Sequence, residues 1–147
     1  RLLLGSDGSA SVACAPHADG SQKPWRVGFA PAAIDAASPL ILHKTTNRRV
    51  YDRARQARPG LDDVLLWNDR GEVTESTIAN IVIDVAGRLI TPAERCGLLP
   101  GVLRAELLDR GEVAEGVLTT DDVARASRVW LINTLRGWID VSVVGRS

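Results

Sequence analysis

The chain has 147 residues, the length of one compact domain, and its 18 basic residues balance 18 acidic ones. Hydrophobic residues make up 45% of the chain and charged residues 24%, which excludes a disordered tail, a collagen-like chain and a coiled coil. A nucleic-acid-binding domain would carry a basic excess, and a membrane span would need about 18 consecutive apolar residues, so we expect neither kind of partner.

Cys14 and Cys96 are the only cysteines, and each has apolar or small neighbours. We therefore expect two buried, reduced thiols in a cytoplasmic protein, with a disulfide as the alternative. No His, Cys or Asp residues have the spacing of a metal site, so no metal is expected. The chain has no methionine and opens within an expected strand, which predicts that it is a piece of a longer polypeptide.

The beginning of the chain has the pattern of a small, loop-rich unit. Asp7-Gly8 favours the tight turn of a hairpin. The stretch 31–39 is rich in Ala, Pro and Ser, which favours a linker between two units. The expected elements before it are strands over 1–4 and 11–15, a polar loop over 17–23 and a strand over 24–30.

After the linker, helical and strand patterns alternate, which predicts an α/β or α+β domain. Asp63 to Trp67 is a nearly continuous apolar run, typical of a strand covered on both faces. Thr119 and Asp122 have the spacing of a capping box. The other expected elements are a helix around 50–57, strands at 81–85 and 89–90, a helix opened by Gly101, a short helix at 123–126, and strands at 129–132 and 139–144.

Four polar stretches interrupt this apolar pattern. The first, His43 to Arg48, directly follows the apolar residues 40–42. A lysine at the end of a buried segment loses solvation, which favours a nucleophilic amine at Lys44. An exposed lysine at a helix start, capped by a threonine, explains the same stretch.

The other three stretches lie further along the chain. Glu75 and Asn80 flank small residues that would let a planar ring approach the backbone. Pro100-Gly101 opens a helix whose free N–H groups suit a phosphate. Thr134 lies in a polar interruption between two strands, where its hydroxyl is available for a second phosphate contact. Taken singly, each stretch is better explained by an ordinary polar edge, helix start or turn.

Together and in this order, the four stretches resemble the motifs of the fold-type IV pyridoxal-phosphate enzymes, also called class IV aminotransferases. The motifs His-Lys-Thr-Thr-Asn-Arg (43–48) and Asn-Thr-Leu-Arg-Gly-Trp (133–138) are most similar to those of the 4-amino-4-deoxychorismate lyase branch. They are especially similar to the lyase segment fused behind an aminodeoxychorismate synthase component I. The resemblance is most specific over residues 40–138. It implies a mixed α/β (α+β) fold: the large cofactor-binding domain of the D-amino-acid-aminotransferase-like fold over 37–147, preceded by a remnant of the small domain and a linker over 1–36.

The resemblance assigns roles to particular residues. Lys44 sits where the family's Schiff-base lysine sits, and would hold pyridoxal 5′-phosphate and then act as the base. Glu75 matches the acidic partner of the pyridine nitrogen, and Asn80 matches a position that lines the pocket. The amides of Val102 and Leu103 match the phosphate contact at the helix start, although the family usually has Thr at the position of Leu103.

The late polar stretch matches a loop of the family that contacts the phosphate. Thr134 matches the hydroxyl contact in that loop. Arg48, Asn133 and Arg136 are assigned only to substrate contact, positioning or charge balance.

The implied reaction is elimination of pyruvate from 4-amino-4-deoxychorismate, which leaves 4-aminobenzoate, a folate precursor. A transaminase of branched-chain or D-amino acids is the alternative within the family, and a non-catalytic dimerisation or scaffold domain is the alternative from another class. Family members are typically homodimers, so we expect a homodimer, with Trp138 as a candidate interface residue, and a covalent fusion to a chorismate-using synthase domain. Because most of the small domain is missing, we expect the chain alone to be a weak or inactive catalyst.

Overall fold

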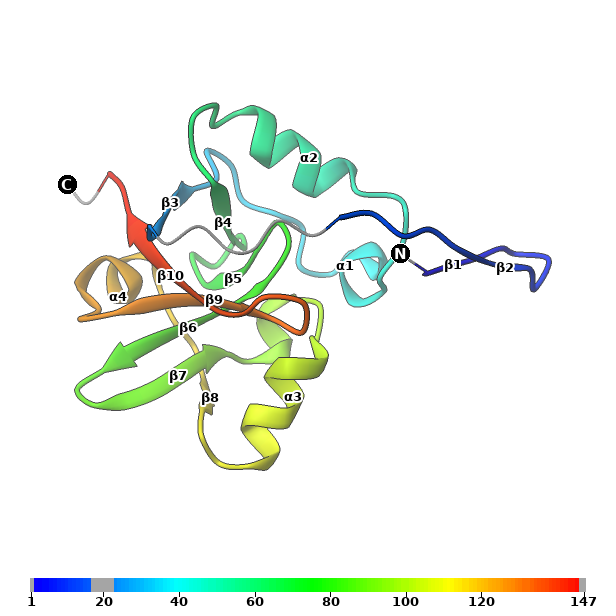
Figure 1. The fold of residues 1–147 in the computed structure, drawn as a ribbon. Coiled ribbons are helices and arrows are strands. Elements are labelled where there is room, and N and C mark those ends of the chain that lie inside the picture. The colour runs from blue at the N-terminus through cyan, green and yellow to red at the C-terminus, as the bar shows by residue number, and fades with distance from the viewer. Residues whose placement is uncertain (1, 17–22, 146–147) are drawn as a thin grey trace.

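The computed structural model describes residues 2–16 and 23–145. Its centre is a mixed, eight-stranded sheet with helices packed against it, and a two-stranded hairpin, β1 (Leu2–Leu4) and β2 (Ala10–Val12), forms a second, separate sheet (Figure 1). Most of the predicted loop over 17–23 and the first residue of the predicted strand over 1–4 lie outside the described residues. In the described part of the chain, no helix has the length and apolarity needed to cross a bilayer.

The large sheet runs in the order β5-β4-β3-β10-β9-β6-β7-β8. β3 pairs in parallel with β4 and β10, and β7 pairs in parallel with β8, whereas the other neighbours are antiparallel. At the start of β5, the backbone N–H of Val73 donates to the carbonyl of Leu118, 2.7 Å away and just beyond β8. The two ends of the sheet therefore meet, and the sheet curls on itself. The strands are β3 (Trp25–Phe29), β4 (Asp63–Trp67), β5 (Val73–Ser76), β6 (Asn80–Val85), β7 (Arg88–Pro92), β8 (Ala114–Gly116), β9 (Val129–Asn133) and β10 (Gly137–Val143).

Alternating side chains of the strands build separate apolar clusters on the two faces of the sheet. On β4, Leu65 belongs to one cluster, whereas Val64 and Leu66 pack with Ala54 of α2 in another. At the end of the sheet away from β4 and β5, Leu107 of α3 packs with residues of β6 and β9 in a third cluster. The helices are α1 (Pro39–Leu42), α2 (Arg49–Gln56), the 3-10 helix η1 (Glu94–Cys96), α3 (Val102–Asp109) and α4 (Thr120–Arg125).

Local sequence signals located several of these elements correctly. The strand predicted over Asp63–Trp67 is confirmed. Its first four residues, 63–66, are all buried, as expected for a strand covered on both faces. The capping box is also confirmed: the Thr119 hydroxyl accepts from the N–H of Asp122, and the Asp122 carboxylate accepts from the N–H of Thr119. It starts α4 at Thr120, three residues earlier than predicted.

The stretch 31–39, predicted to be a linker between two units, packs against β4 of the large sheet. The N–H of Ile34 donates to the carbonyl of Trp67 at 2.8 Å, and the Ile34 side chain is buried against β4. β3, which the sequence analysis assigned to the small-domain remnant over 1–36, lies in the middle of the large sheet. Its parallel partners are far away in the sequence, so a local pattern cannot reveal that position.

Within the segment 1–36, the hairpin β1–β2 is the part that extends away from the sheet (Figure 1). All the residues described from 2 to 16 are exposed, including Leu4, which is 75% exposed. The prediction of two buried thiols is therefore wrong for Cys14, because the segment that follows the hairpin is not covered. Cys96 is buried as predicted, and both cysteines are free thiols.

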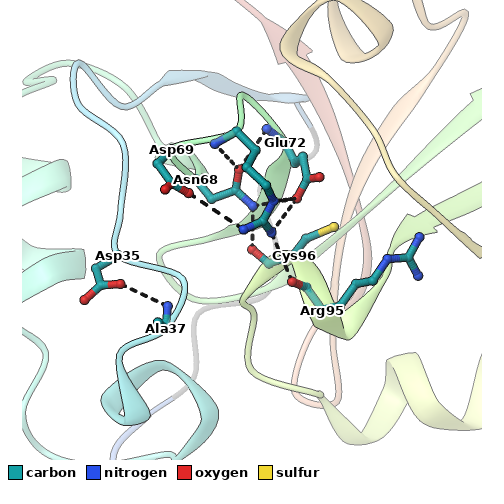
Figure 2. Close-up of polar contacts among 8 residues, drawn as sticks. Asp35, Ala37, Asn68, Asp69, Glu72, Arg95 and Cys96 are labelled. Carbon is teal, nitrogen blue, oxygen red and sulfur yellow. Dashed lines mark hydrogen bonds and ion pairs between the residues drawn. The ribbon is translucent and has the colours of Figure 1, made fainter.

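A polar network around the buried Asn68 fixes the turn between β4 and β5 (Figure 2). The Asn68 amide donates to a Glu72 carboxylate oxygen at 2.7 Å and to the carbonyl of Cys96 at 2.9 Å. Its oxygen accepts from the N–H groups of Arg70 and Glu72, each at 3.0 Å. Hydrogen bonds from Arg70 and then Asn68 lower the pKa of Glu72 to about 2. The Arg70 guanidinium also donates to the carbonyl of Arg95 at 3.1 Å, so the turn is tied to the segment that leads into residues 97–101.

Asn68→Ala removes four hydrogen bonds and leaves buried partners unsatisfied. We expect it to lower the free energy of unfolding by about 2–4 kcal/mol, measured by urea denaturation. Asn47→Ala is the matched control, because Asn47 is exposed and should change stability by less than about 0.5 kcal/mol. Equal losses in the two variants would contradict the structural role of the Asn68 network.

Candidate functional site

A cavity of about 1150 Å³ brings the four polar stretches together. They come from the segment before α2, the β5–β6 connection, the start of α3 and the β9–β10 turn. This volume lies slightly above the usual range for small-molecule sites. The cavity is lined by all nine residues predicted from the sequence: Lys44, Arg48, Glu75, Asn80, Val102, Leu103, Asn133, Thr134 and Arg136.

Lys44 lies at the cavity, but it is exposed. The preceding apolar run forms the single turn α1, in which Ile41 is buried while Leu40 and Leu42 are 42% and 48% exposed. The prediction that Lys44 ends a buried segment is therefore wrong. A one-turn helix can direct only part of such a run into the core, so Leu40 stays exposed at the cavity and Leu42 is exposed outside its lining.

Arg48 connects the start of α2 to the β5–β6 connection. Its guanidinium donates to the carbonyl of Thr77 at 2.5 Å, and it lies 4.9 Å from the centre of the Tyr51 ring. The Thr77 hydroxyl in turn donates to the buried Asp63 carboxylate on β4. These contacts fix the connection that carries the wall of the cavity between β5 and β6.

Glu75 is a buried carboxylate in the cavity wall, only 4% exposed. Its Oε1 accepts from the Tyr51 hydroxyl at 2.8 Å and from the N–H of Leu99 at 3.2 Å. Burial raises the pKa of Glu75 to about 7, while the Tyr51 and Leu99 hydrogen bonds and the charges of Arg48 and Lys44 act in the opposite direction. The carboxylate can therefore exchange a proton close to neutral pH.

Asn80 holds the turn that precedes α3. Its amide donates to the carbonyl of Leu99 at 2.9 Å, and its oxygen accepts from the N–H of Gly101 at 3.2 Å. A Cβ atom on residue 101 would lie 2.3 Å from the Asn80 oxygen, so this close approach requires glycine. Among the residues that the structure describes, no side chain caps α3, so its first N–H groups, at Val102 and Leu103, are available to an anion in the cavity.

The β9–β10 turn closes another side of the cavity. The Asn133 oxygen accepts from the N–H groups of Leu135 and Arg136 at 3.1 and 2.8 Å, which fixes the shape of the turn. The Thr134 side chain is exposed at the cavity, and the Arg136 guanidinium lies 5.7 Å from the centre of the Trp25 ring. The turn thus presents one hydroxyl and one cation.

Tyr51 is the main lining residue that the sequence analysis missed. It is the only tyrosine in the chain, and it precedes Ala54 by three residues, so it shares the inward side of the predicted helix. A polar aromatic residue on an otherwise apolar helix face was the available signal. Its role became visible only with the position of Glu75.

Positive charge dominates the cavity lining. Lys44, Arg48, Arg104 and Arg136 contribute cations, of which Arg104 is paired with Glu94 and Glu115, whereas Glu75 is the one carboxylate among the lining residues described. No group of three or more His, Cys, Asp or Glu residues within 2–16 and 23–145 could hold a metal ion. An amine, a buried carboxylate and an uncapped helix start in one positive cavity suit an anionic ligand that reacts with amines.

Comparisons with known proteins are consistent with this chemistry. The model of the amino-transferase class IV family matches residues 5–144. A Schizosaccharomyces pombe protein named "Putative aminodeoxychorismate lyase" is 37% identical over 106 residues, covering 67% of this chain and 46% of that protein. The chain therefore spans less than half the length of this curated relative.

Two solved structures share the fold. A "Putative amino-acid aminotransferase" from Mesorhizobium loti is 40% identical, with a TM-score of 0.92, and covers 97% of this chain and 71% of that one. A branched-chain amino acid aminotransferase from Thermobaculum terrenum, solved in its PLP form, is 20% identical with a TM-score of 0.74 over 85% of this chain and 44% of that one. The first agrees in sequence and fold, and the second in fold alone.

Glu75→Gln should change how stability depends on pH. The folded pKa of about 7 lies above the ordinary 4.5, so the folded state binds more protons between these values, and the free energy of unfolding falls as pH rises through 7. Full ionisation of Glu75 therefore lowers the free energy of unfolding by roughly 3 kcal/mol, the equivalent of the difference between the two pKa values. A glutamine oxygen still accepts both hydrogen bonds but does not ionise, so Glu75→Gln should stabilise the chain more at pH 8 than at pH 5.

Melting temperatures at the two pH values, without added cofactor, measure this effect. Glu112→Gln is the matched control, because the Glu112 side chain is 50% exposed. An equal effect of Glu75→Gln at both pH values would contradict the raised pKa.

Proposed function

Because the chain belongs to the amino-transferase class IV family, we propose that its cavity binds pyridoxal 5′-phosphate and that the protein is a 4-amino-4-deoxychorismate lyase. The observation that carries the proposal is that Lys44, Glu75, Thr134 and the start of α3 all line one cavity. The products would be pyruvate and 4-aminobenzoate.

The residues present fit this cofactor. Glu75 offers a buried carboxylate to the pyridine nitrogen, and the uncapped N–H groups of Val102 and Leu103 offer an anion site to the phosphate. The close approach of Gly101 to Asn80 holds that helix start in the cavity wall. Thr134 would add a hydroxyl contact to the phosphate, and Lys44 would bind the aldehyde carbon.

The protein residues would then handle protons and charge. The bound cofactor supplies an acceptor for the electrons of a carbanion. The Lys44 amine would take the proton from the carbon that bears the substrate nitrogen. The C–O bond on the neighbouring carbon would then break, the enolpyruvate would leave with the electron pair and take up a proton to become pyruvate, and the ring would become aromatic. Glu75, when ionised, would keep the pyridine nitrogen protonated.

The charge of the cavity favours the lyase over a transaminase. Besides Lys44, the cavity presents the guanidinium groups of Arg48 and Arg136, and these two cations are available to pair with substrate carboxylates. Aminodeoxychorismate carries two carboxylates, whereas branched-chain amino acids carry one. The Schizosaccharomyces pombe relative supports the same choice, and the Mesorhizobium loti relative supports the transaminase as the second candidate.

Borohydride reduction with pyridoxal phosphate tests cofactor attachment. Lys23 and Lys44 are the only lysines of the chain, so peptide mass mapping has two side chains to distinguish. We expect a stable phosphopyridoxyl group on Lys44, its loss in Lys44→Arg, and unchanged labelling in Lys23→Arg. A folded chain without label on Lys44 would instead support the non-catalytic scaffold domain.

Product analysis separates the two enzyme activities. With aminodeoxychorismate we expect equal amounts of pyruvate and 4-aminobenzoate, at a low rate for the 147-residue chain, because the exposed Lys44 leaves water in the site. Faster transfer of the amino group from a branched-chain or D-amino acid to a 2-oxo acid would favour the transaminase. A rate typical of a complete enzyme would contradict the expected weakness of the isolated chain.

A homodimer is the partner arrangement that we propose. Exposed apolar side chains surround the cavity mouth, among them Ile78, Val102 and Leu135, and such patches mark interfaces. Trp138, 39% exposed, lies next to the β9–β10 turn and contacts Trp130 edge-to-face at 5.6 Å between ring centres. A second copy would cover these side chains.

Trp138→Ala should weaken this dimer by tenfold or more, because a buried tryptophan is a typical anchor of an interface. Analytical ultracentrifugation across a concentration series measures the dissociation constant. Val85→Ala is the control, since Val85 is 43% exposed at the opposite end of β6 from Asn80 and does not line the cavity. An unchanged oligomeric state in Trp138→Ala would count against a role of this residue in dimerisation.

A further inference from the structure

Tyr51 connects α2 to the buried carboxylate of the site. Its hydroxyl donates to Glu75 Oε1 at 2.8 Å, and the Arg48 guanidinium lies over its ring at 4.9 Å from the centre. Arg48 itself is held by the carbonyl of Thr77 at 2.5 Å. The ring therefore has a fixed place between the start of α2 and the β5–β6 connection, and its hydroxyl has a fixed direction.

The two hydrogen bonds to Glu75 converge on the same oxygen. Tyr51 and the N–H of Leu99 both donate to Oε1, whereas Oε2 accepts no hydrogen bond from the described residues. Glu75 lines the cavity, so Oε2 is the oxygen left for a ligand. This division of the carboxylate leaves one oxygen for the protein and one for the cavity.

The proton in the Tyr51–Glu75 hydrogen bond belongs to Tyr51. Burial and the neighbouring Glu75 carboxylate raise the pKa of Tyr51 well above its ordinary value, while the pKa of Glu75 is about 7. The other charged groups that act on Glu75 are Arg48 and Lys44, and both favour its ionised form, as the Leu99 N–H does. The hydroxyl of Tyr51 thus stabilises the carboxylate form of Glu75.

We propose that Tyr51 is a positioning residue, whose hydroxyl fixes Oε1 of Glu75 so that Oε2 can bind the ring nitrogen of the cofactor as a carboxylate at neutral pH. The inference rests on the proposed function for the identity of the ligand, but the effect of Tyr51 on Glu75 does not depend on it. Without the hydroxyl, Glu75 would be protonated at neutral pH, and the ring nitrogen would lose its anionic partner.

The chain offers a direct spectroscopic probe of this pair. Because Tyr51 is the only tyrosine, growth on 3-fluorotyrosine places fluorine at this one position. In the 147-residue chain without added cofactor, we expect the fluorine resonance to shift with a midpoint near pH 7, as Glu75 ionises, and to lose this transition in Glu75→Gln. A folded chain whose resonance is unchanged between pH 5 and 9 would overturn the proposal.

Tyr51→Phe tests the energetic effect of the hydroxyl. Carbon-13 labelling of glutamate carboxyls, with Glu75→Gln to assign the signal, reports the midpoint of Glu75 directly. We expect Tyr51→Phe to raise this midpoint by about one pH unit, a tenfold change in the proton affinity. Thr91→Val is the matched control, since it removes a buried hydroxyl bonded to the carbonyl of Ile81, outside the cavity lining, and should leave the midpoint unchanged.

The same measurement on the fluorinated chain covers the case in which Tyr51→Phe fails to fold. Fluorine makes the phenol more acidic and a stronger donor, so the Glu75 midpoint should fall below that of the unmodified chain. An unchanged midpoint in both the fluorinated chain and a folded Tyr51→Phe would overturn the proposal.

Cofactor titration separates this inference from the proposed function. With pyridoxal phosphate bound, the pH midpoint of the cofactor absorbance should move in Tyr51→Phe and stay in Thr91→Val. If the unmodified chain binds no cofactor but Glu75 titrates as expected, the proposed function fails and the effect of Tyr51 on Glu75 stands. If the cofactor binds and its pH profile is the same in Tyr51→Phe, the positioning role fails and the proposed function stands.

Discussion

The site depends on placing one carboxylate, Glu75, in a wall where burial removes most of its contact with water. Burial alone favours the neutral acid, so the charged form is available near neutral pH only because the surrounding groups favour it. Two of them come from opposite directions along the chain, Tyr51 from 24 residues before Glu75 and Leu99 from 24 residues after it. The helix α2, the strand β5 and the turn before α3 therefore have to reach their positions together.

The curled sheet provides that meeting point. β5 is the strand at one edge of the sheet. The backbone N–H of Val73 at its start nevertheless donates to the carbonyl of Leu118, which lies just beyond β8 at the opposite edge. The same curl brings the end of β5 close to the segment between η1 and α3, whose backbone is held by Asn80 and, further back, by Asn68. Two buried asparagines thus fix the backbone that meets Glu75 and opens α3. Neither contributes charge, and each acts through the geometry of its amide.

The sequence predicted the fold class and the polar stretches that meet at one cavity, but not the order of the strands around it. Lys44, Glu75 and Thr134 were identified because polar residues interrupt apolar runs in an order that resembles one family, and the structure places them on one cavity. The central place of β3 was not predictable, since its parallel partners β4 and β10 lie far along the chain. The exposure of Lys44 was missed because apolar residues before it suggested burial, although a single turn of helix buries only one of them. The partnership of Tyr51 with Glu75 depends on tertiary contact and has no local pattern.

Burial divides the residues of the cavity into two groups with different consequences for function. Glu75 and Asn80 are buried and fixed by hydrogen bonds inside this chain. In the proposed function they would serve the ring nitrogen and the phosphate site, which every reaction of the cofactor shares. Leu40, Ile78 and Leu135 are exposed at the mouth, and none of them is assigned to the cofactor. A change at the mouth alters which substrate enters and how much water stays, and it costs little folding energy. A family can therefore keep one buried cofactor site and vary its reaction at the rim, which explains how a lyase and an aminotransferase can both be close relatives of this chain.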